Sequence, residues 1–285
     1  MRYRAHITSL NVNPNENRIV VSLNRREFVY RMAGTLSVPA AALIESAAAG
    51  SHLRASAARP NAPIRAVLFD AFPVFDPRSV QAVVESELPG HGASLTTLWR
   101  TRQFEYTWLR TAAQDYADFW QCTGDALRFA CASLHIELDA AQRDRLMNAY
   151  LTLRPWPDAP DALRMLKQEG LRLGFLSNFT PAMLDAAIEG SRLRGVFEHV
   201  LSTDRARTYK PDPRAYQLGI DALQLPREQV LFVAFAGWDA AGASRFGYQT
   251  YWVNRMKLPP EELGHAPDGV GYSLDDLARF VAARR

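Results

Sequence analysis

The sequence predicts an α/β fold in which a doubly wound parallel sheet carries an inserted helical cap. Residues 64–69 form a short apolar run that ends at Asp70, a pattern typical of a buried parallel strand. From residue 160 onward, similar apolar runs alternate with helical segments, whereas residues 79–159 show a helical pattern and no comparable strand. This alternation favours a Rossmann-like core made of residues 58–78 and 160–285, interrupted by a helical cap over residues 79–159.

The core is expected to alternate strands and helices after the cap. The strands are expected at residues 171–176, 199–202, 230–234 and 249–253, and the helices at residues 181–189, 213–223 and 238–246. In a doubly wound sheet, ligands bind outside the carboxyl ends of the strands. The residues just past those ends are therefore the candidates for a functional site: Asp70, Ser177, Asn178, residues 204–210 and residues 234–239.

Composition and charge exclude several classes of protein. The 285 residues are 48% hydrophobic and 22% charged, which suits a folded core and excludes a wholly disordered chain. Residues 1–57 hold seven basic and three acidic side chains, whereas the remainder holds 26 basic and 27 acidic ones. The net charge of +3 therefore belongs to the N-terminal stretch, and the body gives no reason to expect a nucleic-acid partner. No stable membrane span is expected either, since no run of about 18 apolar residues occurs.

The basic N-terminal stretch resembles a twin-arginine export signal. Arg25 and Arg26 follow an asparagine, residues 32–44 are mildly apolar, and small residues at 55–57 suit a cleavage site. Residues 1–57 are therefore interpreted as a leader that directs the protein to the periplasm, with cleavage after Ala49 as another possibility. The alternative is a cytoplasmic protein with an unstructured, alanine-rich arm.

Four short motifs occur in order along the expected core. They are Phe-Asp-Ala-Phe at residues 69–72, Leu-Ser-Asn at 176–178, Tyr-Lys-Pro at 209–211 and Gly-Trp-Asp-Ala-Ala-Gly-Ala at 237–243. These motifs resemble those of the haloacid dehalogenase superfamily, and closely those of its type II L-2-haloacid, or (S)-2-haloacid, dehalogenases. Segments at residues 98–100, 105–110 and 126–129 are similar to the cap of that family. The resemblance extends over roughly residues 64–283.

The resemblance implies a reaction and a set of site residues. In such enzymes an aspartate at the Asp70 position attacks C2 of a small 2-halo carboxylate, and water then hydrolyses the aspartyl ester to the inverted 2-hydroxy acid. Lys210 would support the ionised nucleophile, Ser177 would hold the substrate carboxylate, and Arg100 would receive the halide. Asp239 would orient or deprotonate the hydrolytic water. The implied catalytic residues are Asp70, Arg100, Ser177, Lys210 and Asp239, and the implied substrate-binding residues are Phe72, Phe104, Phe119, Asn178, Tyr216 and Trp238.

Phe72 separates this reading from a phosphatase of the same superfamily. Such phosphatases have Asp-x-Asp, in which the second acid transfers a proton and the first binds Mg²⁺. Phenylalanine at residue 72 cannot transfer a proton, so we expect a displacement without metal or other cofactor. The expected ligand is a small 2-halo carboxylate, and the resemblance also implies a homodimer.

Two departures from the family pattern leave alternatives open. The family's first motif continues Asp-Ala-Tyr-Gly-Thr-Leu-Phe-Asp, whereas this chain has Pro73 and no Gly-Thr. In the fourth motif, Ser-Ser-Asn-Ala-Trp-Asp becomes Ala-Phe-Ala-Gly-Trp-Asp, so Ala234 and Ala236 replace polar residues near the hydrolytic water. A protein that binds small carboxylates but turns them over poorly, or a hydrolase for another small substrate, therefore remain as alternatives.

Overall fold

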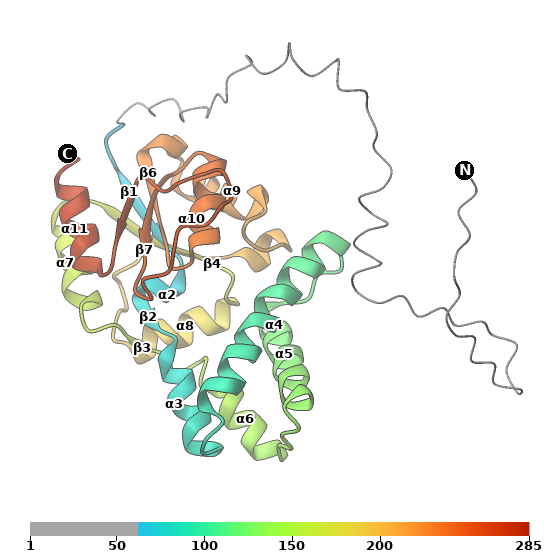
Figure 1. The fold of residues 1–285 in the computed structure, drawn as a ribbon. Coiled ribbons are helices and arrows are strands. Elements are labelled where there is room, and N and C mark those ends of the chain that lie inside the picture. The colour runs from blue at the N-terminus through green and yellow to red at the C-terminus, as the bar shows by residue number, and fades with distance from the viewer. Residues whose placement is uncertain (1–61, 285) are drawn as a thin grey trace, which may run out of the picture. The chain divides into compact units, whose positions relative to one another are not determined.

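The core of the protein is a six-stranded parallel sheet; the sequence predicts the parallel sheet and five of its strands, but not the strand at Gly269–Gly271. The computed structural model describes residues 62–284, so the expected leader lies outside the described residues. The strand order is β5-β4-β1-β6-β7-β8, and Figure 1 shows helices covering the sheet. The strands are β1 (Ala66–Phe69), β4 (Arg172–Ser177), β5 (His199–Ser202), β6 (Val230–Ala234), β7 (Gln249–Val253) and β8 (Gly269–Gly271).

The strand order places a crevice at the end of β1. From β1 the chain builds outward through β4 and β5 on one side, and through β6, β7 and β8 on the other. Phe69, the last residue of β1, pairs in register with Phe175 of β4 and Val233 of β6. Because the winding reverses here, the loops after these three strands diverge and leave the crevice in which doubly wound proteins bind ligands.

Both faces of the sheet are buried because the strands are apolar on both sides. Val67 and Phe69 belong to one core cluster, together with apolar residues of α7 (Ala159–Gln168), α8 (Pro181–Gly190) and α11 (Leu274–Ala282). Ala66 and Leu68 belong to a second cluster, which includes residues of α9 (Pro213–Leu223) and α10 (Gly237–Phe246). This division follows from the alternation of side chains along a strand. Short 3₁₀ helices cover residues 203–206 and 227–229.

Four helices form the cap between β1 and β4: α3 (Arg78–Glu87), α4 (Gly92–Ala113), α5 (Phe119–Ser133) and α6 (Ala140–Asn148). They lie together at one end of the molecule in Figure 1. In α4, Leu95, Trp99 and Gln103 recur every four residues and are buried. Trp99 Nε1 donates to the carbonyl of Thr123 (2.8 Å) and Gln103 Nε2 to its hydroxyl (2.7 Å), which fixes α4 against α5.

A two-stranded antiparallel ribbon connects the core to the cap. It pairs β2 (Phe75–Asp76) with β3 (Arg154–Pro155). Between β1 and β2 lies α2 (Ala71–Val74), a single helical turn that begins directly after Asp70. No helix within residues 62–284 has both the length and the apolar character to cross a membrane.

Candidate active site

Asp70 stands at the carboxyl end of β1, where the crevice opens. Its backbone N–H donates to the carbonyl of Val233 (3.0 Å), so β6 fixes the position of its Cα. Its Oδ1 accepts from Lys210 Nζ (2.9 Å) and from the Ser177 hydroxyl (3.3 Å). Its Oδ2 accepts only from the N–H of Phe72 (3.2 Å) among the described residues. Oδ2 is therefore the carboxylate oxygen that is freer to react.

The turn after Asp70 accommodates the first departure from the family pattern. Asp70 caps α2, and Pro73 is the third residue of that helix. The first four N–H groups of a helix have no partner within it, so the missing N–H of proline costs no hydrogen bond there. The Phe72 N–H and the Ser177 hydroxyl supply contacts to the Asp70 carboxylate. The shortened loop therefore keeps the carboxylate hydrogen-bonded.

Lys210 lies behind Asp70 and joins it to a second carboxylate. Its side chain is only 1% exposed, and its Nζ donates to Asp70 Oδ1 (2.9 Å) and to Asp239 Oδ2 (2.6 Å). Burial opposes the charged ammonium, but the two carboxylates outweigh burial and raise the pKa of Lys210. Lys210 is thus a buried, charged side chain that forms an ion pair with both Asp70 and Asp239.

Asp239 is the second acid of the site, in the first turn of α10. It is 2% exposed, and its Oδ1 accepts from the Tyr216 hydroxyl (2.7 Å). Burial raises the pKa of Asp239 to about 6, although Lys210 and the Tyr216 hydrogen bond favour its charged form. A carboxyl group with a pKa of about 6 is suited to take up a proton near neutral pH.

The structure corrects the expected position of Tyr216. Its side chain is fully buried on α9 and does not line the pocket, as a substrate-binding residue would. Burial, together with the neighbouring Asp239, raises the pKa of Tyr216 well above its usual value, so the phenol stays a hydrogen-bond donor. Tyr248 donates to the Tyr216 carbonyl (2.6 Å). Tyr216 therefore supports Asp239 from behind.

Ser177 and Asn178 present donors at the end of β4. The Ser177 hydroxyl contacts Asp70 and also accepts from the N–H of Phe179 (3.3 Å). The Asn178 Oδ1 accepts from the Lys210 N–H (3.1 Å) and the Thr203 hydroxyl (3.3 Å), which fixes the orientation of the amide. Its Nδ2 is buried, lacks a partner among the described residues and belongs to the pocket lining. Such an amide nitrogen is a ready donor for an anionic ligand.

Arg100 reaches the same pocket from α4 of the cap. Its guanidinium lies over the rings of Phe72 (4.9 Å), Phe235 (5.2 Å) and Phe104 (5.9 Å). Burial lowers the pKa of Arg100. No carboxylate within residues 62–284 forms an ion pair with Arg100, whereas Arg110 and Arg255 are each paired with an aspartate. Buried arginines in proteins are usually paired in this way. Aromatic contacts on its faces leave the N–H edge of the guanidinium available for an anion.

These groups converge on one narrow pocket with an empty volume of about 320 Å³. Half of its lining is aromatic, so its walls are apolar and its polar groups are few. Nine of the eleven predicted site residues line it; Lys210 and Tyr216 lie behind the wall. The lining residues are Asp70, Phe72, Arg100, Phe104, Phe119, Ser177, Asn178, Phe179, Phe235, Ala236, Trp238 and Asp239.

Two aromatic wall residues were not among the named substrate-binding residues, although Phe235 lies within the candidate stretch 234–239. Phe179 packs edge-on against Phe72 (ring centroids 5.2 Å apart), and Phe235 packs against the same ring at 5.8 Å. Both directly adjoin predicted motifs, since Phe179 follows Asn178 and Phe235 lies between the two alanines of the fourth motif. Phe179 follows β4 and Phe235 follows β6, so their positions just past a strand end could have indicated that both residues lie at the site.

The second departure persists in the structure. Ala234 ends β6 and is fully buried, and Ala236 lines the pocket with a methyl group. The space beside them holds Phe235, whose carbonyl accepts from Trp252 Nε1 (3.0 Å). Among residues 62–284, no three His, Cys, Asp or Glu side chains are grouped as metal ligands.

Comparisons with known proteins agree with this geometry. The sequence model of the haloacid dehalogenase-like hydrolase family matches residues 40–247 of this chain. An (S)-2-haloacid dehalogenase of Pseudomonas sp. strain YL is 45% identical over 206 residues, which are 72% of this chain and 89% of that protein. Haloacetate dehalogenase H-2 of Moraxella sp. strain B is 39% identical over 77% of this chain and 98% of that protein.

A solved structure extends the similarity to the fold. It is an L-2-haloacid dehalogenase of Xanthobacter autotrophicus with chloropropionic acid covalently bound, 34% identical, with a TM-score of 0.72 over 77% of this chain and 98% of that one. The ordered motifs, the acid–lysine–acid arrangement and these matches agree with one another. The chain belongs to the haloacid dehalogenase-like hydrolase family.

Proposed function

We propose that the protein hydrolyses small (S)-2-halo carboxylic acids to (R)-2-hydroxy acids through an aspartyl ester on Asp70. The observation that carries this proposal is the shared pocket of the Asp70 carboxylate and the Arg100 guanidinium, which has no ion-pair partner among the described residues. A nucleophile on the core side and a cation on the cap side suit a displacement that expels an anion. The relatives named as (S)-2-haloacid dehalogenases support the same reaction.

The first step forms the ester and releases the halide. Asp70 Oδ2 attacks C2 of the substrate, a new C–O bond forms, and the C–halogen bond breaks with its electron pair leaving on the halide. Arg100 stabilises the departing anion in an apolar pocket. The Asn178 Nδ2 donates to the substrate carboxylate, and the Ser177 hydroxyl turns its single proton from Asp70 Oδ1 to the same carboxylate. Together they hold C2 in line with the attacking oxygen. This displacement inverts the configuration at C2.

The second step hydrolyses the ester and regenerates Asp70. Asp239 takes a proton from water, and the resulting hydroxide attacks Cγ of Asp70. The bond between Cγ and the oxygen on C2 then breaks, that oxygen takes the proton from Asp239 and leaves as the hydroxyl of the 2-hydroxy acid, and the new Asp70 carboxyl group loses its proton to solvent. Lys210 stabilises the negative charge that develops on the Asp70 carboxyl group. The inversion of the first step is therefore retained in the product.

Halide release tests the proposal directly. Purified protein is expected to release halide from (S)-2-chloropropionate without added metal, and the product is expected to be (R)-lactate. The enantiomer (R)-2-chloropropionate serves as the matched control, because its C–halogen bond cannot point at Arg100 while its carboxylate occupies the same donors. If the protein releases no halide from either enantiomer or from chloroacetate, the proposal is wrong.

A second candidate function is capture of the substrate with poor turnover. Both carboxylate oxygens of Asp239 are already engaged, by Lys210 and Tyr216, and the nearby wall residue Ala236 offers only a methyl group. An ordered water needs two to four polar partners, so water is weakly held beside Asp239.

We expect a burst of about one halide per protein followed by slower release, measured by rapid quench. Ala236→Asn is expected to speed the slow phase about tenfold, the value of roughly one hydrogen bond to a charged group. A linear time course without a burst would contradict this expectation.

The aromatic wall limits the size of the acid. Phe235, where the family motif has serine, contacts both the Phe72 ring (5.8 Å) and the Arg100 guanidinium (5.2 Å). We expect Phe235→Ser to raise kcat/KM for 2-chlorobutyrate relative to chloroacetate by about 10- to 100-fold. Room for one extra methylene group in an apolar pocket changes the ratio of kcat/KM values by about this factor. Competition between the two acids, followed by chromatography of the products, measures the ratio. An unchanged ratio would show that Phe235 does not set substrate size.

The pKa of Asp239 predicts how the second step depends on pH. Only the carboxylate form can accept a proton from water, and this form becomes the major one as the pH rises through about 6. In the ester Asp70 no longer carries the charge that helps to raise this pKa, so the midpoint is expected at about 6 or slightly below. The rate of ester hydrolysis should fall about tenfold per pH unit below that midpoint and level off above about 7. Single-turnover product formation between pH 4.5 and 8 measures the profile. A flat profile across this range would exclude Asp239 as the base.

Location and assembly complete the proposal. We propose that the protein is exported to the periplasm, supported by the Arg25–Arg26 pair and the apolar run after it. Replacement of both arginines by lysine is expected to leave the protein in the cytoplasmic fraction. We also propose a homodimer, as the resemblance implies; the exposed side chains of Leu109 and Phe129 on the cap offer apolar surface for it. Sedimentation measures the assembly.

A further inference from the structure

We propose that Trp156 and Arg255 are positioning residues that hold the α2 turn and thereby orient Asp70 for attack. The inference rests on the proposed function, in which Asp70 is the nucleophile. Neither residue lines the pocket, so both act through the backbone of α2 and make no contact with the substrate.

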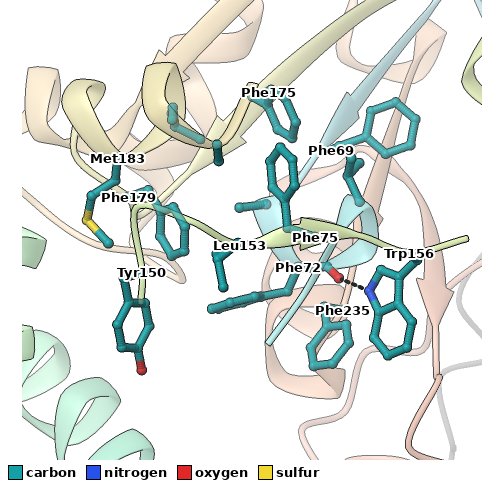
Figure 2. Close-up of a cluster of buried hydrophobic side chains, with 14 of the residues drawn as sticks. Phe69, Phe72, Phe75, Tyr150, Leu153, Trp156, Phe175, Phe179, Met183 and Phe235 are labelled. Carbon is teal, nitrogen blue, oxygen red and sulfur yellow. Dashed lines mark hydrogen bonds between the residues drawn. The ribbon is translucent and has the colours of Figure 1, made fainter. Parts of the chain in front are cut away.

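Side chains distant in the sequence hold the carbonyl groups of α2. Trp156 Nε1 donates to the Phe72 carbonyl (2.9 Å), as Figure 2 shows, and the Trp156 backbone N–H donates to the Val74 carbonyl (2.9 Å). Arg255 Nη2 donates to the Pro73 carbonyl (3.0 Å). Three consecutive carbonyls of a one-turn helix are therefore held by two residues distant in sequence. The carbonyls at a helix end have no partner within the helix, so these external donors define where the turn lies.

The α2 turn cannot hold this position by itself. A single helical turn fixes several backbone dihedrals for one internal hydrogen bond and is unstable in isolation. At the end of the turn, the Phe75 N–H donates to the Ala71 carbonyl. At its other end, α2 is fixed by the bond from the Phe72 N–H to Asp70 Oδ2. Phe72 therefore links Asp70 to Trp156, with its N–H on the reactive carboxylate and its carbonyl on the indole.

The two holding residues are themselves rigidly placed. Two guanidinium groups lie over the Trp156 ring, that of Arg78 at 4.5 Å and that of Arg255 at 4.3 Å from its centroid. The Arg255 side chain is 7% exposed, and its Nη2 also donates to Asp158 Oδ1 (3.0 Å). Asp158 Oδ2 in turn accepts from the N–H of Leu274 at the start of α11. This chain of contacts fixes the α2 turn to the core.

Trp156 also lies where the chain returns from the cap. It follows β3 directly, and β3 pairs with β2, which follows α2. The ribbon that joins the cap to the core therefore places the Trp156 indole beside the α2 turn. A displacement requires the attacking oxygen to lie within a few tenths of an ångström of its line of approach to C2. A looser α2 turn should therefore slow the attack while substrate binding stays unchanged.

The test measures attack and backbone order separately. Trp156→Phe keeps an aromatic ring beside the two guanidinium groups and removes the Nε1–H donor together with the pyrrole ring; Trp120→Phe makes the same loss of volume. We expect the single-turnover rate of halide release from (S)-2-chloropropionate to fall about tenfold, with KM unchanged, and amide hydrogen exchange in residues 70–75 to become faster. Arg255→Met is expected to do the same, and Arg255→Lys to recover part of the rate because an ammonium can donate to both acceptors. Trp120→Phe, at a partly buried cap tryptophan outside the pocket lining, is the matched control.

Each outcome decides the matter. A slower rate with unchanged KM and faster exchange supports the inference. Unchanged rate and exchange in both Trp156→Phe and Arg255→Met overturns it, as does an equal loss in Trp120→Phe, which would indicate general destabilisation. If the wild-type protein releases no halide, the proposed function fails, and exchange in residues 70–75 alone then decides the positioning role.

Discussion

Asp70→Asn is expected to lower halide release from (S)-2-chloropropionate by at least about 10⁴-fold. The amide oxygen is a far weaker nucleophile than the carboxylate, and removal of a nucleophile from an enzyme that uses one costs about this much or more. The fold should survive, because the amide oxygen of asparagine can still cap α2 by accepting from the Phe72 N–H, and Lys210 keeps its bond to Asp239. Ion chromatography of halide at saturating substrate measures the loss, and circular dichroism checks the fold.

The Asp70 result needs a control for the change of charge. Asp185→Asn makes the same substitution on the exposed surface of α8 and is expected to leave the rate unchanged. Binding of propionate, which has no leaving group, should persist in Asp70→Asn because Ser177 and Asn178 still donate to the carboxylate. Equal halide release by the wild-type protein and Asp70→Asn would refute the assignment of the nucleophile.

The sequence was informative about the sheet and about the side chains at its edge. Each buried strand of the core is a short apolar run, and expected strands such as residues 230–234 and 249–253 agree with β6 and β7. Once the strands are located, a doubly wound topology brings their carboxyl ends together. Asp70 and Ser177 could therefore be placed at one crevice before any distance was known.

Other features depend on contacts that no local pattern contains. Tyr216 was assigned to the pocket by resemblance alone, but its place on α9 directs its hydroxyl to the far side of Asp239. The α2 turn is too short to show helical periodicity, and its stability comes from Trp156 and Arg255, 84 and 182 residues away along the chain. Contacts across such separations follow from the packed structure, so sequence reasoning missed this pair.

Asp239→Asn is expected to separate the two steps of the reaction. An amide cannot accept the proton of water, so ester hydrolysis should slow by about 10²- to 10⁴-fold, the usual contribution of a general base. Ester formation requires only Asp70, its donors and Arg100, and Lys210 keeps its contact with Asp70 Oδ1 (2.9 Å). We therefore expect one equivalent of halide per protein within the first turnover and almost none afterwards.

Mass spectrometry then identifies the trapped species. The peptide that contains Asp70 should gain one 1-carboxyethyl group, attached through C2 of the substrate, in Asp239→Asn, and the adduct should disappear on treatment with hydroxylamine, which cleaves esters. Asp221→Asn, an exposed carboxylate on the same helix as Tyr216, is the matched control and should turn over like the wild type. Trapping also distinguishes two readings of the wild-type burst. If Ala236 alone limits hydrolysis, the wild type shows the same adduct for a shorter time, whereas an adduct absent from both proteins would mean that the displacement does not pass through Asp70.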